Sequence, residues 1–451
     1  MRRLATLGGG SRPRREGGAL RAESPTLLRV VGTRRLAATI FNVVVGAGIF
    51  ALPGVIAGLI GTAAPIAYLA CTGATLLVAL SYASAGSRVS KAGGSYAYVA
   101  AGLGPIVGAV GGVLAWLADT LAAASVAAGL MSALWTYLPT AGAGIGRALV
   151  LATLIAVIAA INIRGVRQGA AFVEGMTVAK LIPLLLFVLV GASLMTWDAR
   201  LLPTWPTVDV LGRTMLVLMF AFSGAESALS LSGEVERPER AVPRALLMSL
   251  AAVSLLYSSV HIVAFGALGD GLTTSTAAPL ADAGGQLAGP WLRAVMLAGT
   301  ILSMLGYLSA VLMSTPRLLY SIAAGGLLPR ALTAIHPRFR TPWVAIIVQN
   351  TVVLAASLSG SFAVLVPLVS VAILAVYLMV ALSVVVLQQR PAQPPGAFTV
   401  PIGVPVGAAL LSLWMLSNAR PEELALEAAV IVVALVLVIV RRRALVAAVG
   451  T

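Results

Sequence analysis

Twelve long apolar stretches, separated by short polar segments, constrain this chain more than any other feature of its sequence. Each is close to the roughly 20 residues that an α-helix needs to cross the hydrocarbon core of a lipid bilayer. Hydrocarbon offers no water to pair backbone amides, so a spanning segment must satisfy them internally, as a helix does. The sequence therefore predicts an all-α integral membrane protein with twelve transmembrane helices. The stretches fall near residues 36–60, 62–86, 105–137, 147–163, 169–196, 209–233, 242–268, 290–323, 342–358, 361–388, 400–418 and 422–441.

The basic residues assign an orientation to these helices. With a cytoplasmic N-terminus, 24 of the 30 Lys and Arg residues face the cytoplasm and 5 face outward, as the positive-inside rule requires. We therefore expect a multi-pass protein of the inner (cytoplasmic) membrane with both termini cytoplasmic. The rule also accounts for the net charge of +15, so no nucleic acid partner is predicted. Residues 1–35 hold nine arginines and are expected to form a disordered basic tail that can touch anionic lipid.

Motifs for enzymatic chemistry are missing from the sequence. It contains no HExxH, CxxC, P-loop or nucleophile-elbow pattern, which are the short motifs tied to metal, phosphate and acyl chemistry. The single cysteine, Cys71, lies inside an apolar stretch, where a lone thiol is expected to pack. We therefore predict no metal, no cofactor and no enzymatic activity.

The first apolar stretch is interrupted at residues 42–54, which read NVVVGAGIFALPG. Gly46 and Gly48 each cost roughly 1 kcal/mol relative to alanine in a helix interior. A broken helix at membrane depth is tolerated only where it is buried in protein or lines a cavity. The amides after the break then suit a carboxylate, and the carbonyls of Val43 and Val44 suit a cation. The alternative is that these glycines only let two helices pack closely.

The sixth stretch is interrupted as well, at Ser223-Gly224-Ala225, with Glu226 directly following. Interrupted segments at corresponding places in two halves are the best sequence pointer to a transporter binding site. Because the two breaks are five stretches apart, the halves would have opposite orientations. The predicted organisation is the tail 1–35, a first five-helix repeat over 36–196, a second inverted repeat over 209–388, two extra helices within 400–441, and a short tail over 442–451.

Four segments carry a resemblance to a known family. They are GAGIFALPG at 46–54, AGGSYAYVAAGLGPIVGAVGGVLAW at 92–116, FAFSGAESALSLSGEVERPERAVP at 220–243 and STPRLLYSIAAGGLLPRALTAIHP at 314–337. Together they resemble the amino acid–polyamine–organocation superfamily of transporters, including its bacterial amino acid permeases and arginine–agmatine antiporters. The similarity covers about 34–441 and implies a 5+5 inverted repeat with broken helices one and six, plus two extra helices. It also implies amino acid or amine transport by alternating access.

The resemblance further implies how an amino acid would be held. Its carboxylate would meet the amides around Gly46, and its ammonium would meet carbonyls at the two breaks. Phe220 aligns with an aromatic gate beside the site. Val311 aligns roughly with the aromatic residue that arginine–agmatine antiporters use for a guanidinium, which argues against a cationic substrate. The predicted substrate-binding residues are Val43, Val44, Gly46, Ala47, Gly48, Phe220, Ala221, Ser223, Gly224 and Val311.

Three charged residues fall inside predicted helices. By the resemblance, Lys180 matches the lysine that replaces a bridging sodium ion in sodium-independent relatives. It is therefore expected to donate hydrogen bonds to the first helix and to Ser309 or a neighbour, and it could carry the coupled proton. The alternative is a lysine whose charged end snorkels to the membrane interface. Glu226 is expected to be proton-linked, or else to cap the broken helix. Asp119 has no family motif, and it could pair with an Asn or Ser of a neighbouring helix or contact a substrate amine.

These observations predict a secondary active transporter of a neutral amino acid, sodium-independent and either proton-coupled or an exchanger. The walls named above offer no full counter-charge to a substrate side chain, apart from Asp119 and Glu226. The alternatives are an amine or polyamine carrier with Asp119 as its counter-ion, and a receptor that keeps the fold without transporting. The sequence leaves the oligomeric state open.

Overall fold

The structure of the protein is a computed structural model. It describes residues 32–89, 94–135, 144–164, 166–197, 201–228, 238–275, 277–326, 328–391 and 397–449. Throughout these residues the regular elements are helices, and none is a strand. Residues 1–31, most of the predicted basic tail, lie outside the described part of the chain.

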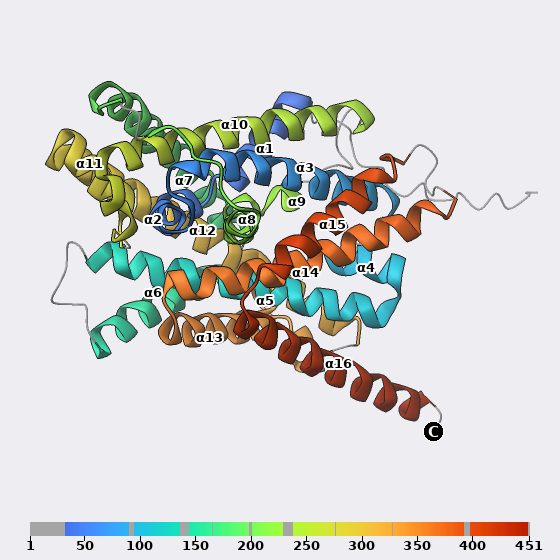
Figure 1. Cartoon of the computed structure of the whole chain (residues 1–451). Helices are drawn as coiled ribbons and strands as arrows, with labels where there is room; N and C mark the ends of the chain where they lie inside the picture. The colour runs from blue at the N-terminus through green and yellow to red at the C-terminus, as the bar shows by residue number, and fades with distance from the viewer. Residues whose placement is uncertain are drawn as a thin grey trace, which may run out of the picture.

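Within the described ranges, the helices form twelve transmembrane segments in the predicted order (Figure 1). They are α1–α2 (Thr33–Val44 and Gly48–Ile60), α3 (Ala64–Arg88), α5 (Pro105–Trp135), α6 (Ile145–Arg164), α7 (Val166–Leu194), α8–α9 (Val208–Phe222 and Ala225–Ala228), α10 (Pro238–Leu268), α12 (Pro290–Ala324), α13 (Trp343–Ser359), α14 (Phe362–Gln388), α15 (Gly403–Ser417) and α16 (Pro421–Val449). Short helices α4 (Ser95–Leu103) and α11 (Pro279–Ala288) precede α5 and α12. The fold is that of an all-α membrane protein.

Glycine and proline set several of the helix boundaries. Gly104, with φ +94°, ends α4, and Pro105 begins α5. Gly289, with φ +79°, likewise separates α11 from Pro290 at the start of α12. Glycine adopts positive φ without steric cost, and proline fits the first turn of a helix because its missing amide would be unpaired there. These pairs let the chain turn sharply between a short helix and a long one.

The packing of the helices follows the inverted repeat. Helix α5 packs extensively on α14, and α12 packs extensively on α7, which is the equivalent pair with the halves exchanged. In the same way, the first helix of each half packs against the second helix of the other half: α1 packs on α10, and α8 packs on α3. Helices α5 and α12, the third of each half, also pack against each other. Helix α16 runs along one flank of the bundle, and its C-terminal end projects beyond the other helices (Figure 1).

Small residues bring the helices that flank the breaks into close contact. A Cβ on Gly299 of α12 would lie 2.7 Å from Pro183 of α7, and one on Gly48 of α2 would lie 2.9 Å from the Cβ of Ala221 in α8. Helices in membranes approach in this way at glycine and alanine. Packing therefore fixes α2 against α8, which places the two interrupted helices side by side.

Candidate functional site between the interrupted helices

Both predicted breaks are present. Helix α1 ends at Val44 and α2 begins at Gly48, with the Gly46 amide donating to the Val44 carbonyl at 2.7 Å. Helix α8 ends at Phe222, and Gly224 follows with φ +108°. A Cβ on Gly224 would lie 3.0 Å from Cγ1 of Val43. The two breaks therefore touch, and glycine is needed at the second one for both its conformation and its lack of a side chain.

The first break leaves one buried backbone amide without a hydrogen-bond partner among the described residues. Ala47 is 1% exposed, and its amide forms no hydrogen bond with the described residues, whereas its carbonyl accepts from the Phe50 amide at 3.2 Å. Buried backbone amides are nearly always paired. An unpaired amide at the start of α2 is the kind of donor that binds a carboxylate at a helix N-terminus.

A cavity of about 370 Å³ opens beside the two breaks, within the size range of small-molecule sites. Five of the predicted substrate-binding residues line it: Val43, Gly46, Ser223, Gly224 and Val311. The three predicted intramembrane charges line it as well: Lys180, Glu226 and Asp119. Sequence positions almost 270 residues apart thus meet around one space. The remaining lining residues are Asn42 of α1, Ile373 of α14, and six residues of α12: Ser303, Gly306, Tyr307, Ala310, Met313 and Ser314.

The other five predicted residues do not line this cavity. The Phe220 ring, predicted to stand beside the site, packs edge-on against Phe362 with 5.7 Å between ring centroids. Gly48 faces Ala221 across the α2–α8 contact, which is the helix-packing role that the sequence left open for it. The last two, Val44 and Ala47, are 2% and 1% exposed and do not line the cavity.

Tyr257 of α10 was not predicted, and it joins the two breaks. Its hydroxyl lies 2.9 Å from the Val44 carbonyl and 3.2 Å from the Ala221 carbonyl. The Phe220 carbonyl in turn accepts from the Ser223 hydroxyl at 2.9 Å. Carbonyls that the sequence assigned to a substrate ammonium are thus engaged within the protein. A lone tyrosine in an apolar stretch carries no pattern that would have revealed this contact.

Lys180 reaches the first break from α7. Its Nζ donates to the Asn42 carbonyl in the last turn of α1 at 2.8 Å. On the α12 side, the residue that contacts the break is Ser303, whose hydroxyl donates to the Gly46 carbonyl at 3.2 Å. Ser309 lies in the same helix but does not line the cavity. A charged side chain and a hydroxyl thus tie the fifth and eighth transmembrane segments to the first.

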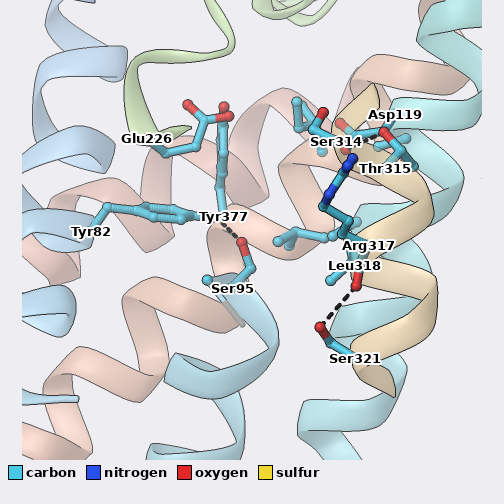
Figure 2. A pocket seen from close by; sticks show the side chains of 15 residues that line it. Tyr82, Ser95, Asp119, Glu226, Ser314, Thr315, Arg317, Leu318, Ser321 and Tyr377 are labelled. Atoms are coloured by element: carbon cyan, nitrogen blue, oxygen red, sulfur yellow. Dashed lines mark hydrogen bonds between the residues drawn. The ribbon is translucent and has the colours of Figure 1, made fainter. Parts of the chain in front are cut away.

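The two carboxylates hold different partners. Glu226 Oε2 accepts from the Gly224 amide at 3.0 Å, so it caps the break in the sixth transmembrane segment. Asp119 Oδ2, on α5, accepts from the Thr315 hydroxyl of α12 at 3.2 Å. Asp119 therefore has a partner on a neighbouring helix, a threonine in place of the expected Asn or Ser, and it still lines the cavity. Both carboxylates also face a second cavity (Figure 2).

The fold and the cavity together are typical of one class of protein: helical membrane transporters, in which two interrupted helices meet beside a cavity. Comparison with known proteins is consistent with this class. The chain belongs to the amino acid permease family, whose model matches residues 31–440.

Its relatives include three transporters of Bacillus subtilis. The methylthioribose transporter is 26% identical over 422 residues, covering 88% of this chain and 89% of the relative. The branched-chain amino acid permease is 27% identical and covers 87% of each chain. The serine/threonine exchanger is 26% identical over 85% of this chain and 89% of the relative. The similarity thus spans nearly the whole transmembrane bundle.

Proposed function

We propose that this protein is a secondary active transporter that carries a neutral amino acid across the cytoplasmic membrane by alternating access. The observation that carries the proposal is the Lys180–Asn42 contact at 2.8 Å, which sets an ammonium beside the cavity between the two breaks. Two relatives named for branched-chain amino acids and for serine and threonine support a neutral substrate.

The substrate would be held mainly by backbone. Its carboxylate would approach the first break at Gly46, which lines the cavity, and would reach the unpaired amide of the adjoining Ala47 only if that residue becomes exposed. Its ammonium would lie near the carbonyl ends of α1 and α8, with Glu226 beside it. Its side chain would face the apolar part of the wall formed by Val43, Val311 and Ile373. Apolar walls with a few placed polar groups are typical of small-molecule sites.

Transport would be independent of sodium because the Lys180 ammonium replaces a bound cation. The direct test is uptake of labelled L-leucine and L-serine into proteoliposomes, with sodium exchanged for potassium or choline. We expect equal initial rates in the three salts. Stimulation by sodium would contradict the proposal, and binding without accumulation would indicate a receptor.

The driving ion would be a proton, or else the counter-substrate of an exchanger. If a proton drives uptake, acidifying the outside should raise the initial rate in liposomes that contain no amino acid. Lys180→Ala and Glu226→Gln separate the two candidate proton carriers, because the variant that lacks the carrier should respond flatly to pH. An exchanger would instead require amino acid inside the liposome at every pH.

A second candidate function is transport of an amine or a cationic amino acid. The observation that favours it is Asp119, a carboxylate on the cavity wall. Competition distinguishes the two: excess L-lysine, agmatine or putrescine would inhibit leucine uptake only if the cavity accepts a second positive charge.

A further inference from the structure

A second cavity, of about 320 Å³, adjoins the first one (Figure 2). Four residues line both cavities: Asp119, Glu226, Ser314 and Ile373. The two carboxylates therefore stand at the partition between them. Its remaining wall consists of Tyr82, Gly94, Ser95, Ala115, Ala118, Thr315, Arg317, Leu318, Ser321, Val376 and Tyr377.

The second cavity lies toward the side of the membrane that the charge distribution assigns to the cytoplasm. Along α12 its lining runs from Ser314 to Ser321, toward the basic segment that follows the helix. Gly94 and Ser95 also line it, and they follow the connection between α3 and α4, which the charge distribution assigns to the same side. Ser314 is exposed although it lies well inside a transmembrane helix. The partition is therefore accessible from at least one of the two cavities that Ser314 lines.

The charges in this cavity are complementary to a free amino acid. Arg317 of α12 is half-buried, and its guanidinium donates to the Met313 carbonyl. No carboxylate of the described residues lies within ion-pair distance of it. Figure 2 shows Glu226 entering from one side of the cavity, with Asp119 and Arg317 on the other. The cavity thus presents one fixed cation and two carboxylates, around a space that is otherwise lined by hydroxyl and apolar groups.

This combination matches both ends of a zwitterion. A guanidinium binds a carboxylate through paired, charge-assisted hydrogen bonds. Carboxylates in a water-filled transmembrane pathway suit an ammonium group. Because Asp119 and Glu226 face both cavities, an ammonium can stay close to them while the carboxylate moves from the first break, beside Gly46, to Arg317.

We propose that the second cavity is an additional amino acid site on the cytoplasmic side, where Arg317 holds the α-carboxylate and Asp119 and Glu226 hold the α-ammonium. The proposal rests on the proposed function, since it adds a second binding site for the same substrate. It makes Arg317 a determinant of affinity at the cytoplasmic face only. The outer face would be served by the first cavity alone.

The test is sided kinetics of the full-length chain in proteoliposomes. The half-saturating concentration of L-leucine is measured separately for the outer and cytoplasmic faces. We expect Arg317→Gln to raise the cytoplasmic value about tenfold, the scale of one lost charge-assisted contact, and to change the outer value less than twofold. Arg330→Gln is the matched control, because Arg330 is an exposed arginine that follows the same helix and does not line the cavity.

A ligand without a carboxylate tests the assigned contact directly. L-Leucinamide keeps the ammonium and side chain, so its inhibition constant at the cytoplasmic face should be the same in wild type and Arg317→Gln. An equal loss for leucine and leucinamide would mean that Arg317 acts on structure, which overturns the proposal. If Arg317→Gln fails to fold, Arg317→Lys keeps the charge but not the paired geometry, and should raise the cytoplasmic value for leucine selectively.

The outcomes separate this inference from the proposed function. Wild-type leucine uptake with unchanged sided affinities in Arg317→Gln would remove the second site and leave the transport function intact. A wild type that takes up neither leucine nor serine would remove both.

Discussion

At the scale of single residues, the two breaks differ in how strictly they require glycine. A Cβ on Gly46 would make an ordinary contact of 3.5 Å with the Tyr307 ring, whereas one on Gly224 would lie 3.0 Å from Val43 on a backbone with φ +108°. Holding a non-glycine residue in that conformation costs of order 1–3 kcal/mol. We therefore expect Gly224→Ala to lower the transport rate at least tenfold and Gly46→Ala to lower it much less, with equal amounts of each variant in the membrane. Equal rates for the two variants would contradict this interpretation of the second break.

Tyr257 provides a second test at this scale. Removing its hydroxyl leaves the Ala221 carbonyl without its bond and the Val44 carbonyl with one partner fewer, and an unsatisfied buried polar group costs about 1–3 kcal/mol. Tyr257→Phe keeps the ring contacts with Tyr68 and Phe222. We therefore expect a folded, correctly inserted protein whose transport rate falls several-fold. An unchanged rate would show that the two breaks do not depend on this link.

The residues that sequence reasoning found and those it missed differ in a physical way. Glycine pairs and intramembrane charges stand out because they destabilise a helix that only crosses the bilayer. Gly46, Gly224 and Lys180, which were found in this way, all line the cavity. The bonds of Tyr257 and Ser303 depend on how separate helices pack, and one hydroxyl in an apolar helix has no distinguishing spacing. The family resemblance places Phe220 beside the site, but the sequence does not indicate that its ring packs against Phe362.

At the scale of elements, Lys180 and Ser303 tie α7 and α12 to the break after α1. The lysine contributes a charge as well as a bond, so the two contacts should not be equivalent. We expect Lys180→Ala to lose most transport and Ser303→Ala to lose only part of it. Initial rates of leucine uptake at matched protein density measure both. Near-normal uptake by Lys180→Ala would reduce the lysine to a snorkelling side chain.

A second link between elements joins the outer ends of α8 and α16 as the sequence orients them. Both guanidinium NH groups of Arg213 lie 2.6 Å from the Glu423 carboxylate oxygens, and the Arg213 and Glu423 side chains are 17% and 10% exposed. Removing one partner of a buried ion pair leaves the other charge buried and unpaired, which lowers the free energy of unfolding by up to about 3–5 kcal/mol. We expect Arg213→Ala to lower the thermal unfolding temperature in detergent by several degrees, and Arg213→Glu combined with Glu423→Arg to recover part of it.

The elements themselves were largely predictable. Apolar length located the twelve segments, and the third runs over Pro105–Trp135 against a predicted 105–137. The short helices α4 and α11 were not predicted, because neither is long enough to be separated from a neighbouring apolar stretch by hydropathy alone. Their boundaries depend on the positive φ of Gly104 and Gly289, a property of the folded backbone.

At the scale of the whole molecule, the two cavities adjoin each other at Asp119, Glu226, Ser314 and Ile373, and the second one extends along α12 toward the side predicted to be cytoplasmic. The opposite side of the site is occupied by the tight α2–α8 contact at Gly48 and by the Phe220–Phe362 ring pair. If the protein works by alternating access, as proposed, this asymmetry corresponds to a state that is closed toward the outside.

Thiol labelling tests this asymmetry across the whole molecule. Ser314 is exposed, whereas Phe220 is 6% exposed and the native Cys71 is fully buried. We expect a membrane-impermeant maleimide to label Ser314→Cys from the cytoplasmic side at least tenfold faster than Phe220→Cys, with wild type as the unlabelled control. Faster labelling of Phe220→Cys would place the route on the other side.

If the Lys180 ammonium takes the place of a bound sodium ion, as proposed, its contact with Asn42 has an energetic consequence for the cell. A dissolved sodium ion that crosses the membrane releases electrical work, about 2.3 kcal/mol per elementary charge at 100 mV. A charge fixed to the polypeptide returns to its starting place in every cycle, so over a complete turnover it can neither draw on that voltage nor dissipate a sodium gradient. The ratio of inside to outside substrate concentration that this protein can sustain should then be independent of the external sodium concentration.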